Sequence, residues 1–316
     1  MLVIEENRVR EILTPALCLD TMRQALRDLE EGKCDMPSRL ICRMPNTAAF
    51  GFMPAYVGDC FGAKVIAAYA PNMGTEYPSH IGYVMLFESE HCTVQGLIEA
   101  GSITEIRTGC VSAVATDLLA KQDAPHLCLI GCGAQARSHL LAISLVRKIE
   151  KVTVYDLSVQ AAEAFKAWAE ETCHVSVQVC DSPRAAAKDA DIICTLTPSK
   201  EAYLTLDMVK PGAHVNAVGT FSPVTREAAS DLVAAARLYA DQVDACRRES
   251  GEYLIPLKEG LCREDHIVGS VGELLLGKCE GRRNDTDITL FDALGLAVED
   301  IAAARQVYLE AAKSCT

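Results

Sequence analysis

A glycine-rich turn near the middle of the chain constrains the fold more than any other feature. An apolar run at 126–130 leads into Gly131-Cys132-Gly133-Ala134-Gln135-Ala136, and a helix-forming segment follows. A second strand-like run, 151–155, ends in Asp156. This order of parts is typical of a dinucleotide-binding β-α-β unit, which has a strand, a G-x-G-x-x-A turn, a helix, a second strand and a terminal acid. An ordinary glycine-rich α/β turn is the alternative, and the agreement of all five parts favours the cofactor site.

Each residue of this turn has a physical role. Gly131 allows the tight turn, Gly133 lets the backbone approach a pyrophosphate, and Ala136 is small enough for close helix–strand packing. The N–H groups at the start of the helix face the phosphate charge. Asp156 can accept hydrogen bonds from both ribose hydroxyls and would repel a 2′-phosphate. The unit is therefore expected to prefer NAD, with NADP disfavoured.

The composition limits the classes of partner. A net charge of −13 argues against a nucleic-acid surface, because phosphate binding needs a basic patch. No stretch of the sequence approaches 18 apolar residues without a charged residue, so we expect no membrane span. The first residues include Glu5 and Glu6, where a secretory signal would carry basic residues. A cytoplasmic protein is expected.

The 15 cysteines are scattered, mostly within apolar segments, and none forms a C-x-x-C pair. In a chain of this size without a secretory signal, buried reduced thiols are favoured over disulfides. Because no cysteine or histidine cluster has ligand spacing, no metal site is expected.

The segment before the glycine turn has the signals of a helix and a mostly antiparallel sheet. Thr14-Pro15 begins a helix that runs towards Gly32. Strand-like runs follow at 38–43, 51–57, 61–69, 81–88 and 93–99. Ser102-Ile103-Thr104-Glu105 has the pattern of a capping box and predicts a helix from there to about Ala120.

From Pro125 onwards, strands and helices alternate. Strands are predicted at 126–130, 151–155, 175–180, 190–195 and 213–218 and near 238–241, and a final helix at 297–312. Such alternation predicts a parallel sheet covered on both faces. The fold class is therefore α/β, a doubly wound Rossmann sheet at 119–292. A sheet-rich α+β domain would combine residues 1–118 with 293–316.

Three cations in the first region could bind a substrate carboxylate, a task for which arginine is suited by its planar fork. Arg39 starts a strand, Lys64 is the only charge in an apolar strand, and Arg107 lies early in the predicted helix. Each has a simpler interpretation. Arg39 could be a surface residue, Lys64 could extend from a sheet edge, and Arg107 could pair with Glu105 or Asp117 on a helix surface.

Candidate cofactor-binding residues also stand at the ends of two of the predicted parallel strands. Thr195 ends one strand and Thr197 follows it, and Val218 ends the next and Gly219 follows it. In a doubly wound sheet these ends face the cofactor crevice. Simple strand termination by turn residues is the alternative. His80 stands between a loop and a strand and is a minor substrate-binding candidate.

The chain resembles the ornithine cyclodeaminase/μ-crystallin family over essentially its full length. The matching stretches are 36–39, 52–56, the strand around Lys64, 78–80, 103–109, 131–136, 211–219, 288–292 and 295–300. The resemblance implies a Rossmann domain, NAD or NADP, a small amino or imino acid substrate, and a sheet-rich domain that dimerises. Arg39 and Arg107 would hold the substrate carboxylate, and Lys64 would bind it or serve as the acid/base. Gly131, Gly133, Gln135, Ala136 and Asp156 would hold the dinucleotide.

One position departs from the cyclodeaminases. They carry an aspartate two residues after the glycine that corresponds to Gly219, and Phe221 stands there instead. Phenylalanine cannot accept a proton, and cyclodeamination needs proton transfer at two amines. μ-Crystallin itself has an asparagine and an arginine after its second strand, which suits NADP, whereas this chain has Asp156-Leu157-Ser158.

The resulting hypothesis is a reductase of small cyclic imino acids, of the ketimine or Δ1-pyrroline-2-carboxylate type, acting as a homodimer with NAD. Hydride would pass from the nicotinamide to the imine carbon. Two alternatives remain open. One is an ornithine cyclodeaminase or an alanine-type amino-acid dehydrogenase with another group in place of the aspartate. The other is a non-catalytic binding protein, as some μ-crystallins are.

Overall fold

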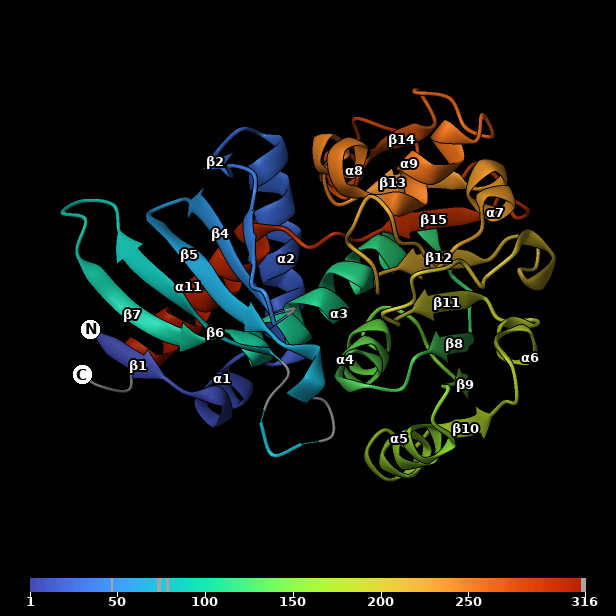
Figure 1. The fold of residues 1–316 in the computed structure, drawn as a ribbon, viewed down its shortest axis with the longest axis horizontal. Coiled ribbons are helices and arrows are strands. Elements are labelled where there is room, and N and C mark those ends of the chain that lie inside the picture. Colours follow the sequence, from blue (N-terminus) through green and yellow to red (C-terminus); the bar gives the residue numbers. More distant parts are fainter. Residues whose placement is uncertain (47, 73–74, 78–79, 314–316) are drawn as a thin grey trace. The chain divides into compact units, whose positions relative to one another are not determined.

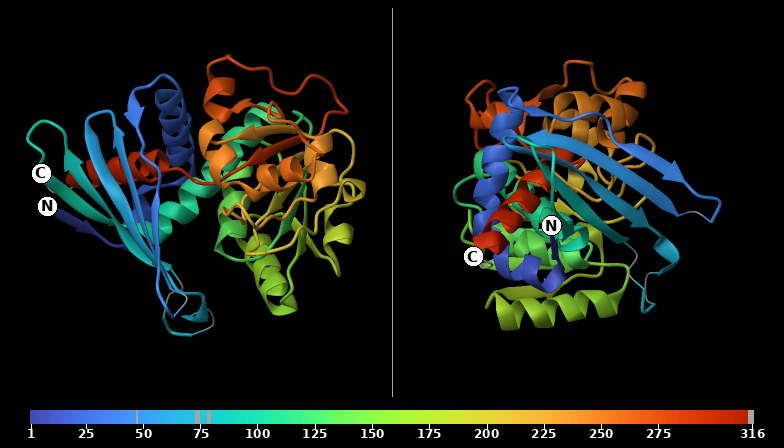
Figure 2. Two further views of the ribbon diagram at one scale, coloured as in Figure 1. Left: turned by 45° about the horizontal axis from the view of Figure 1, so that its top comes forward. Right: turned by 90° about the vertical axis from the view of Figure 1, so that its left-hand side faces the viewer.

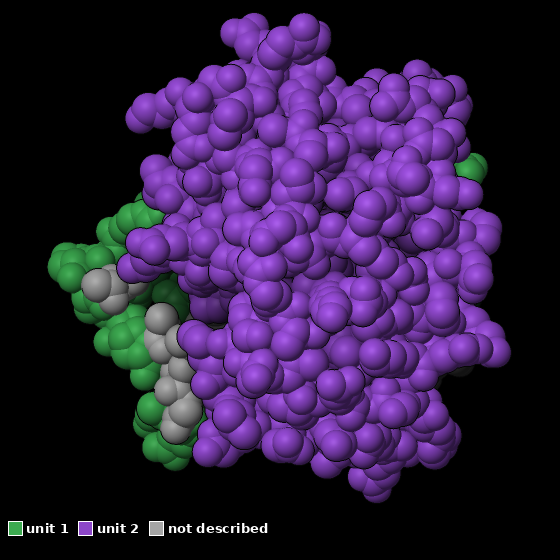
Figure 3. Space-filling model, turned by 90° about the vertical axis from the view of Figure 1, so that its right-hand side faces the viewer, with its two compact units in different colours: residues 1–107, 296–316 green, residues 108–295 purple. Residues whose placement is uncertain are grey.

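The computed structural model describes residues 1–46, 48–72, 75–77 and 80–313 and divides into two compact units (Figure 3). Unit 1 combines Met1–Arg107 with Leu296–Thr316, and unit 2 is Thr108–Gly295. The sequence predicts a division at 118/119 and 292/293. The observed boundary at Arg107 lies inside one continuous helix, which local sequence signals cannot divide.

Unit 1 is a seven-stranded sheet with helices. Its strands are β1 (Leu2–Ile4), β2 (Cys34–Asp35), β3 (Leu40–Arg43), β4 (Ala49–Val57), β5 (Cys60–Ala68), β6 (His80–Glu88) and β7 (Val94–Glu99). Its helices are α1 (Glu6–Ile12), α2 (Pro15–Glu30), the short η1 (Ala70–Asn72), α11 (Ala297–Lys313) and the first part of α3 (Ala100–Leu119). The strand order is β1-β7-β6-β5-β4-β2, with β3 also paired to β4. Every pairing except β1 with β7 is antiparallel, which confirms the predicted antiparallel character.

The two faces of this sheet differ in burial. Along β4, Met53, Ala55 and Val57 are buried, whereas the alternating Phe50, Phe52 and Tyr56 are exposed. Helix α11 lies against the buried face of the sheet (Figures 1 and 2). The last segment of the chain therefore packs back onto the first, as expected.

The predicted capping box at Ser102 is wrong. Helix α3 begins two residues earlier, at Ala100, and the carboxylate of Glu99 caps it. Glu99 Oε2 accepts hydrogen bonds from the Ser102 N–H at 2.8 Å and the Ser102 hydroxyl at 2.5 Å. Glu105 pairs instead with Arg10, with 2.7 Å between Oε2 and Nη2. Glu99, at the end of β7, therefore caps the helix in place of Ser102. The capping pattern alone could not distinguish a cap at Glu99 from a cap at Ser102.

Unit 2 is an eight-stranded sheet in which every pairing is parallel. Its strands are β8 (His126–Ile130), β9 (Lys151–Tyr155), β10 (Ser176–Val179), β11 (Ile192–Thr195), β12 (His214–Ala217), β13 (Arg237–Ala240), β14 (Ile267–Ser270) and β15 (Thr289–Asp292). Besides the second part of α3, its helices are α4 (Ala134–Ile143), α5 (Val159–Thr172), α6 (Pro183–Ala187), the short η2 (Leu206–Met208), α7 (Ser230–Ala235), α8 (Val243–Glu249), α9 (Gly251–Lys258) and α10 (Val271–Leu275). The strand order is β10-β9-β8-β11-β12-β15-β13-β14. Helices lie on both sides of the sheet, for example α4 and α6 (Figure 1).

The predicted parallel sheet is confirmed, and its first two strands coincide with β8 and β9. Strands β14 and β15 had not been predicted. Both are four residues long, and β15 lies between β12 and β13 although it comes last in the chain. Because strand order is set by tertiary packing, its insertion there could not follow from local sequence.

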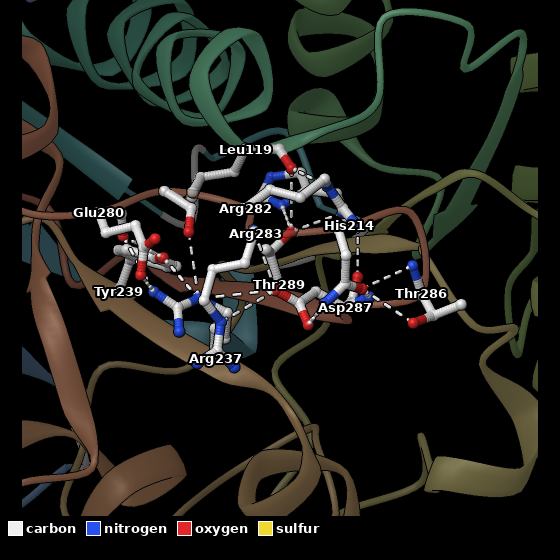
Figure 4. Close-up of polar contacts among 12 residues, drawn as sticks. Leu119, His214, Arg237, Tyr239, Glu280, Arg282, Arg283, Thr286, Asp287 and Thr289 are labelled. Carbon is white, nitrogen blue, oxygen red and sulfur yellow. Dashed lines mark hydrogen bonds and ion pairs between the residues drawn. The ribbon is translucent and has the colours of Figure 1, made fainter.

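A polar network connects loop 276–288 to the amino ends of β12 and β15 (Figure 4). Arg282 donates to the carbonyl of Leu119 at 2.8 Å and to the hydroxyl of Thr289 at 3.1 Å. His214 Nδ1 lies 3.0 Å from the same hydroxyl. Burial lowers the pKa of His214 to about 3, so this histidine is neutral at pH 7. The network fixes the end of the sheet opposite the carboxyl ends of its strands.

Candidate active site

The glycine turn between β8 and α4 has a conformation that requires glycine. Gly131 has a φ of 98°, a region that L-residues rarely adopt. A Cβ at this position would lie 2.7 Å from the carbonyl oxygen of Leu196. The N–H of Gly131 donates to the carbonyl of Tyr155 at 2.8 Å, which joins the turn to the end of β9.

The start of α4 has the features of an anion-binding helix terminus. Gly133 is the exposed N-cap residue, no side chain of the described residues caps it, and an added Cβ there would meet nothing within 4 Å. Ala134 is also exposed, and Ala136 is fully buried. The side-chain oxygen of Gln135 is buried and has no hydrogen-bond partner among the described residues. Accessible backbone N–H groups at a helix start fit a pyrophosphate.

Asp156 follows β9 directly and contacts the glycine turn. Its Oδ2 accepts a hydrogen bond from the N–H of Cys132 at 2.8 Å, and its Oδ1 accepts one from the N–H of Ser158 at 2.8 Å. The carboxylate is partly exposed. Since an ionised carboxylate can accept about four hydrogen bonds, Asp156 retains capacity for ribose hydroxyls.

A carboxylate that the sequence patterns do not predict connects the segments that follow β11 and β12. Glu227 is fully buried, and its Oε1 accepts from the N–H of Thr197 at 2.7 Å and from its hydroxyl at 2.6 Å. Its Oε2 accepts from the N–H of Gly219 at 2.8 Å. Gly219 and Val218 are partly exposed. Thr195 is fully buried, so it packs beneath the accessible residues Val218 and Gly219 and is not itself accessible.

In unit 1, Lys64 lies in the middle of the sheet, since β5 is flanked by β4 and β6. Its side chain is 4% exposed, which excludes the interpretation of a lysine extending from a sheet edge. Lys64 Nζ lies 2.6 Å from Asp300 Oδ2 and donates to the hydroxyl of Thr104 at 3.3 Å. Asp300 belongs to the first turn of α11.

Arg107 shares the same aspartate. Its Nε lies 3.0 Å from Asp300 Oδ1, and its Nη1 lies 2.5 Å from Glu299 Oε2. All three side chains are almost completely buried. A surface pairing with Glu105 or Asp117 is therefore wrong, and those two acids pair with Arg10 and Arg147. In the sequence, only the adjacent acids Glu299 and Asp300 at the start of the last helix could have indicated this cluster.

The electrostatic environment of Lys64 includes three other charges. Burial lowers the pKa of Lys64, and the positive charges of Arg107 and Arg39 lower it further, whereas Asp300 raises it. Arg39 is half-buried just before β3 and is close enough to act on the lysine. Lys64 and Arg107 thus form one cluster with Asp300 in unit 1, and Arg39 acts on it electrostatically. His80 begins β6, but its side chain lies outside what the structure describes.

Three further observations concern the whole described chain. None of the cysteines in the described segments forms a disulfide. No group of three or more histidine, cysteine, aspartate or glutamate residues in those segments is placed to hold a metal ion. Among the helices of the described residues, none combines the length and apolar character that a membrane crossing requires.

Comparisons with known proteins agree over the full length. The Ornithine cyclodeaminase/mu-crystallin family matches residues 1–314. A Delta(1)-pyrroline-2-carboxylate reductase of Bacillus cereus is 33% identical over 312 residues, which cover 98% of this chain and 96% of the relative. The structure of the Thermococcus litoralis Delta(1)-pyrroline-2-carboxylate reductase, in complex with NADH and L-proline, is similar with a TM-score of 0.96 and 31% identity. It covers 100% of this chain and 99% of that one.

An archaeal alanine dehydrogenase dimer with bound NAD has a TM-score of 0.95 and 26% identity, covering 100% of this chain and 97% of that one. The family match, the identity to the reductases and the agreement of both folds extend over nearly every residue. This chain therefore belongs to the ornithine cyclodeaminase/mu-crystallin family.

Proposed function

We propose that this protein is an NADH-dependent reductase of small cyclic imino acids, with Δ1-pyrroline-2-carboxylate as the representative substrate. The observation that carries the proposal is the buried cluster in which Lys64 and Arg107 share Asp300, within the field of Arg39. Such a cluster suits a small anionic substrate with a nitrogen to protonate. The similarity to two reductases of this substrate class supports it.

The residues of unit 1 would bind the substrate and handle the proton. Arg39 and Arg107 hold the carboxylate, because guanidinium groups match its two oxygens. Lys64 donates a proton to the ring nitrogen, and its lowered pKa makes that proton easier to release. A bound NADH supplies the hydride that the imine carbon receives. The C=N π bond is replaced by a C–H and an N–H bond, and the product is a cyclic amino acid.

The residues of unit 2 would bind the dinucleotide. Gly131, Gly133, Ala134 and the start of α4 receive the pyrophosphate, with Gln135 and Ala136 shaping the helix start. Asp156 binds the adenosine ribose and disfavours a 2′-phosphate, so NADH is preferred over NADPH. Thr197, Val218 and Gly219 contact the nicotinamide half, and the buried Thr195 supports them.

Phe221 argues against cyclodeamination as the main activity. It follows β12 in a loop, and its side chain is 61% exposed. An aromatic ring there cannot activate an amine or a water, whereas reduction of a protonated imine needs no second base. The geometry of the Lys64 cluster is compatible with this simpler chemistry.

The protein is also proposed to act as a homodimer. Large apolar side chains are exposed on the outer face of the unit 1 sheet, including Phe50 at 39%, Phe52 at 38% and Tyr56 at 39%. Contiguous exposed apolar faces mark association sites. The alanine dehydrogenase of similar fold is a dimer, which supports this assignment.

A steady-state assay tests the proposed function. The protein should oxidise NADH when given Δ1-pyrroline-2-carboxylate, and NADPH should be a poorer donor. Absence of turnover with either nucleotide across a panel of cyclic imines would overturn the proposal. Formation of proline and ammonia from ornithine with NAD would identify a cyclodeaminase instead.

A further inference from the structure

Glu227 is a buried carboxylate that collects hydrogen bonds from two strand ends. Four donors contact it: the N–H and hydroxyl of Thr197, the hydroxyl of Tyr203 at 2.7 Å, and the N–H of Gly219. A Cβ at Gly219 would lie 2.6 Å from Glu227 Oε2 and 2.1 Å from the carbonyl oxygen of Thr197. The backbone at Gly219 is therefore held directly against the carboxylate.

The Glu227 carboxylate is bonded by two backbone N–H groups and two hydroxyls and has no counterion among the described residues. Acceptance of four donors is the pattern of an ionised carboxylate, which has no proton to donate. Burial raises the pKa of Glu227, and the hydrogen bonds from Thr197 and Tyr203 oppose that shift. Among the described residues, no lysine, arginine or histidine forms an ion pair with it. Another buried acid, Glu252, accepts the backbone N–H of Glu227 at 2.6 Å.

The topology of unit 2 indicates which half of a dinucleotide meets this carboxylate. The chain order reverses between β8 and β11, and in such sheets ligands bind outside the carboxyl ends of the strands at that point. With the pyrophosphate at the start of α4 and the adenosine ribose at Asp156 on the β9 side, the other half extends towards β11 and β12. Thr197 and Gly219 each lie two residues after the end of one of those strands.

We propose that Glu227 is a positioning residue for the nicotinamide half, and that its negative charge favours the oxidised over the reduced dinucleotide. The inference rests on the proposed dinucleotide binding. The nicotinamide ring carries a positive charge only when oxidised, and a nearby carboxylate without a counterion stabilises that form. Bonding to both Thr197 and Gly219 fixes the two strand ends in a single geometry.

The test compares equilibrium binding of NAD⁺ and NADH to Glu227→Gln and to the wild-type protein. Titration calorimetry measures the Kd of NAD⁺, and NADH fluorescence measures that of the reduced form. Glu227→Gln should weaken NAD⁺ about tenfold more than it weakens NADH. Loss of positioning alone would weaken both equally, so the ratio of the two Kd values separates charge from structure.

Matched variants complete the test. Glu252→Gln changes a buried acid that bonds the backbone of Glu227 and Ala228, and it should leave the ratio of the two Kd values unchanged. Glu227→Asp keeps the negative charge and should keep the wild-type preference for NAD⁺. Tyr203→Phe removes one donor to Glu227 and retains the negative charge. It should therefore not weaken NAD⁺ more than NADH, and this result can be obtained even if Glu227→Gln does not fold. Equal weakening of both nucleotides by Glu227→Gln, or a shift of Tyr203→Phe in its direction, would overturn the inference. A wild-type protein that bound neither nucleotide would overturn the proposed function itself.

Discussion

Asp300 Oδ2 lies 2.6 Å from Lys64 Nζ, and both side chains are almost completely buried. The other oxygen of the same carboxylate lies 3.0 Å from Arg107 Nε. Burying an ion pair costs desolvation energy that its own attraction roughly offsets, so such a pair is weak evidence for a purely stabilising role. Because one aspartate fixes both Lys64 and Arg107, the two positive charges are held in a defined geometry, which suits a functional role.

Replacing Lys64 separates substrate chemistry from dinucleotide binding. Lys64→Met should lower kcat/KM for Δ1-pyrroline-2-carboxylate by at least about 100-fold, because the proposed proton donor to the ring nitrogen is lost. The Kd of NADH should be unchanged, because the proposed dinucleotide residues belong to unit 2. Lys148→Met is the matched control, since Lys148 is 88% exposed. Reduction at the wild-type rate in Lys64→Met would show that the lysine has no role in the reaction.

The conformation of the glycine turn predicts a second outcome. Gly131→Ala should weaken NADH binding at least about tenfold and lower the free energy of unfolding by about 1–3 kcal/mol, because a Cβ would meet the carbonyl of Leu196. Gly260→Ala is the control, since Gly260 also has a positive φ, 75°, but its Cβ would meet nothing within 4 Å. It should cost stability without changing NADH affinity. Equal NADH affinities for both variants would contradict the assignment of the turn.

Buried Asp292 at the end of β15 predicts how stability depends on pH. Burial raises its pKa to about 6, above the value of about 3.9 expected in the unfolded chain. The folded state therefore binds this proton more tightly. The associated stability, up to about 3 kcal/mol, is fully present below pH 3.9 and is lost as the pH rises through about 6.

Asp292→Asn should remove this dependence. Unfolding in urea at pH 5 and pH 8 should show that the variant gains stability relative to the wild-type protein at the higher pH. A difference that stays constant between the two pH values would rule out Asp292 as the titrating group.

The exposed apolar face of unit 1 predicts the response of the oligomer. Phe52→Arg should convert a dimer into a monomer, because a charge placed on this face would be desolvated in the interface. Size-exclusion chromatography with light scattering measures the mass, which should be about twice that of the chain for the wild-type protein. Leu261→Arg, at a 56% exposed position in unit 2, should remain dimeric. A Phe52→Arg variant that kept the wild-type mass would place the interface elsewhere.

Local patterns were sufficient for much of unit 2. The apolar runs and the glycine turn predicted β8, β9 and the position of Asp156, because each depends on neighbours within a few tens of residues. The partner of Arg107 could not be predicted in this way, since Asp300 lies 193 residues further along the chain. Glu227 was missed for a similar reason. A lone glutamate in a loop gives no sign that two distant strand ends will bond to it.

Deuterium transfer shows directly whether the hydride of NADH reaches the imine carbon. The protein is incubated with Δ1-pyrroline-2-carboxylate and NADH deuterated at C4 on both faces, and the product is analysed by mass spectrometry. We expect proline with one deuterium at Cα, because the hydride reaches the imine carbon, and its nitrogen proton should exchange with water. Proline without deuterium, or no proline at all, would contradict the assignment of this protein as an imine reductase.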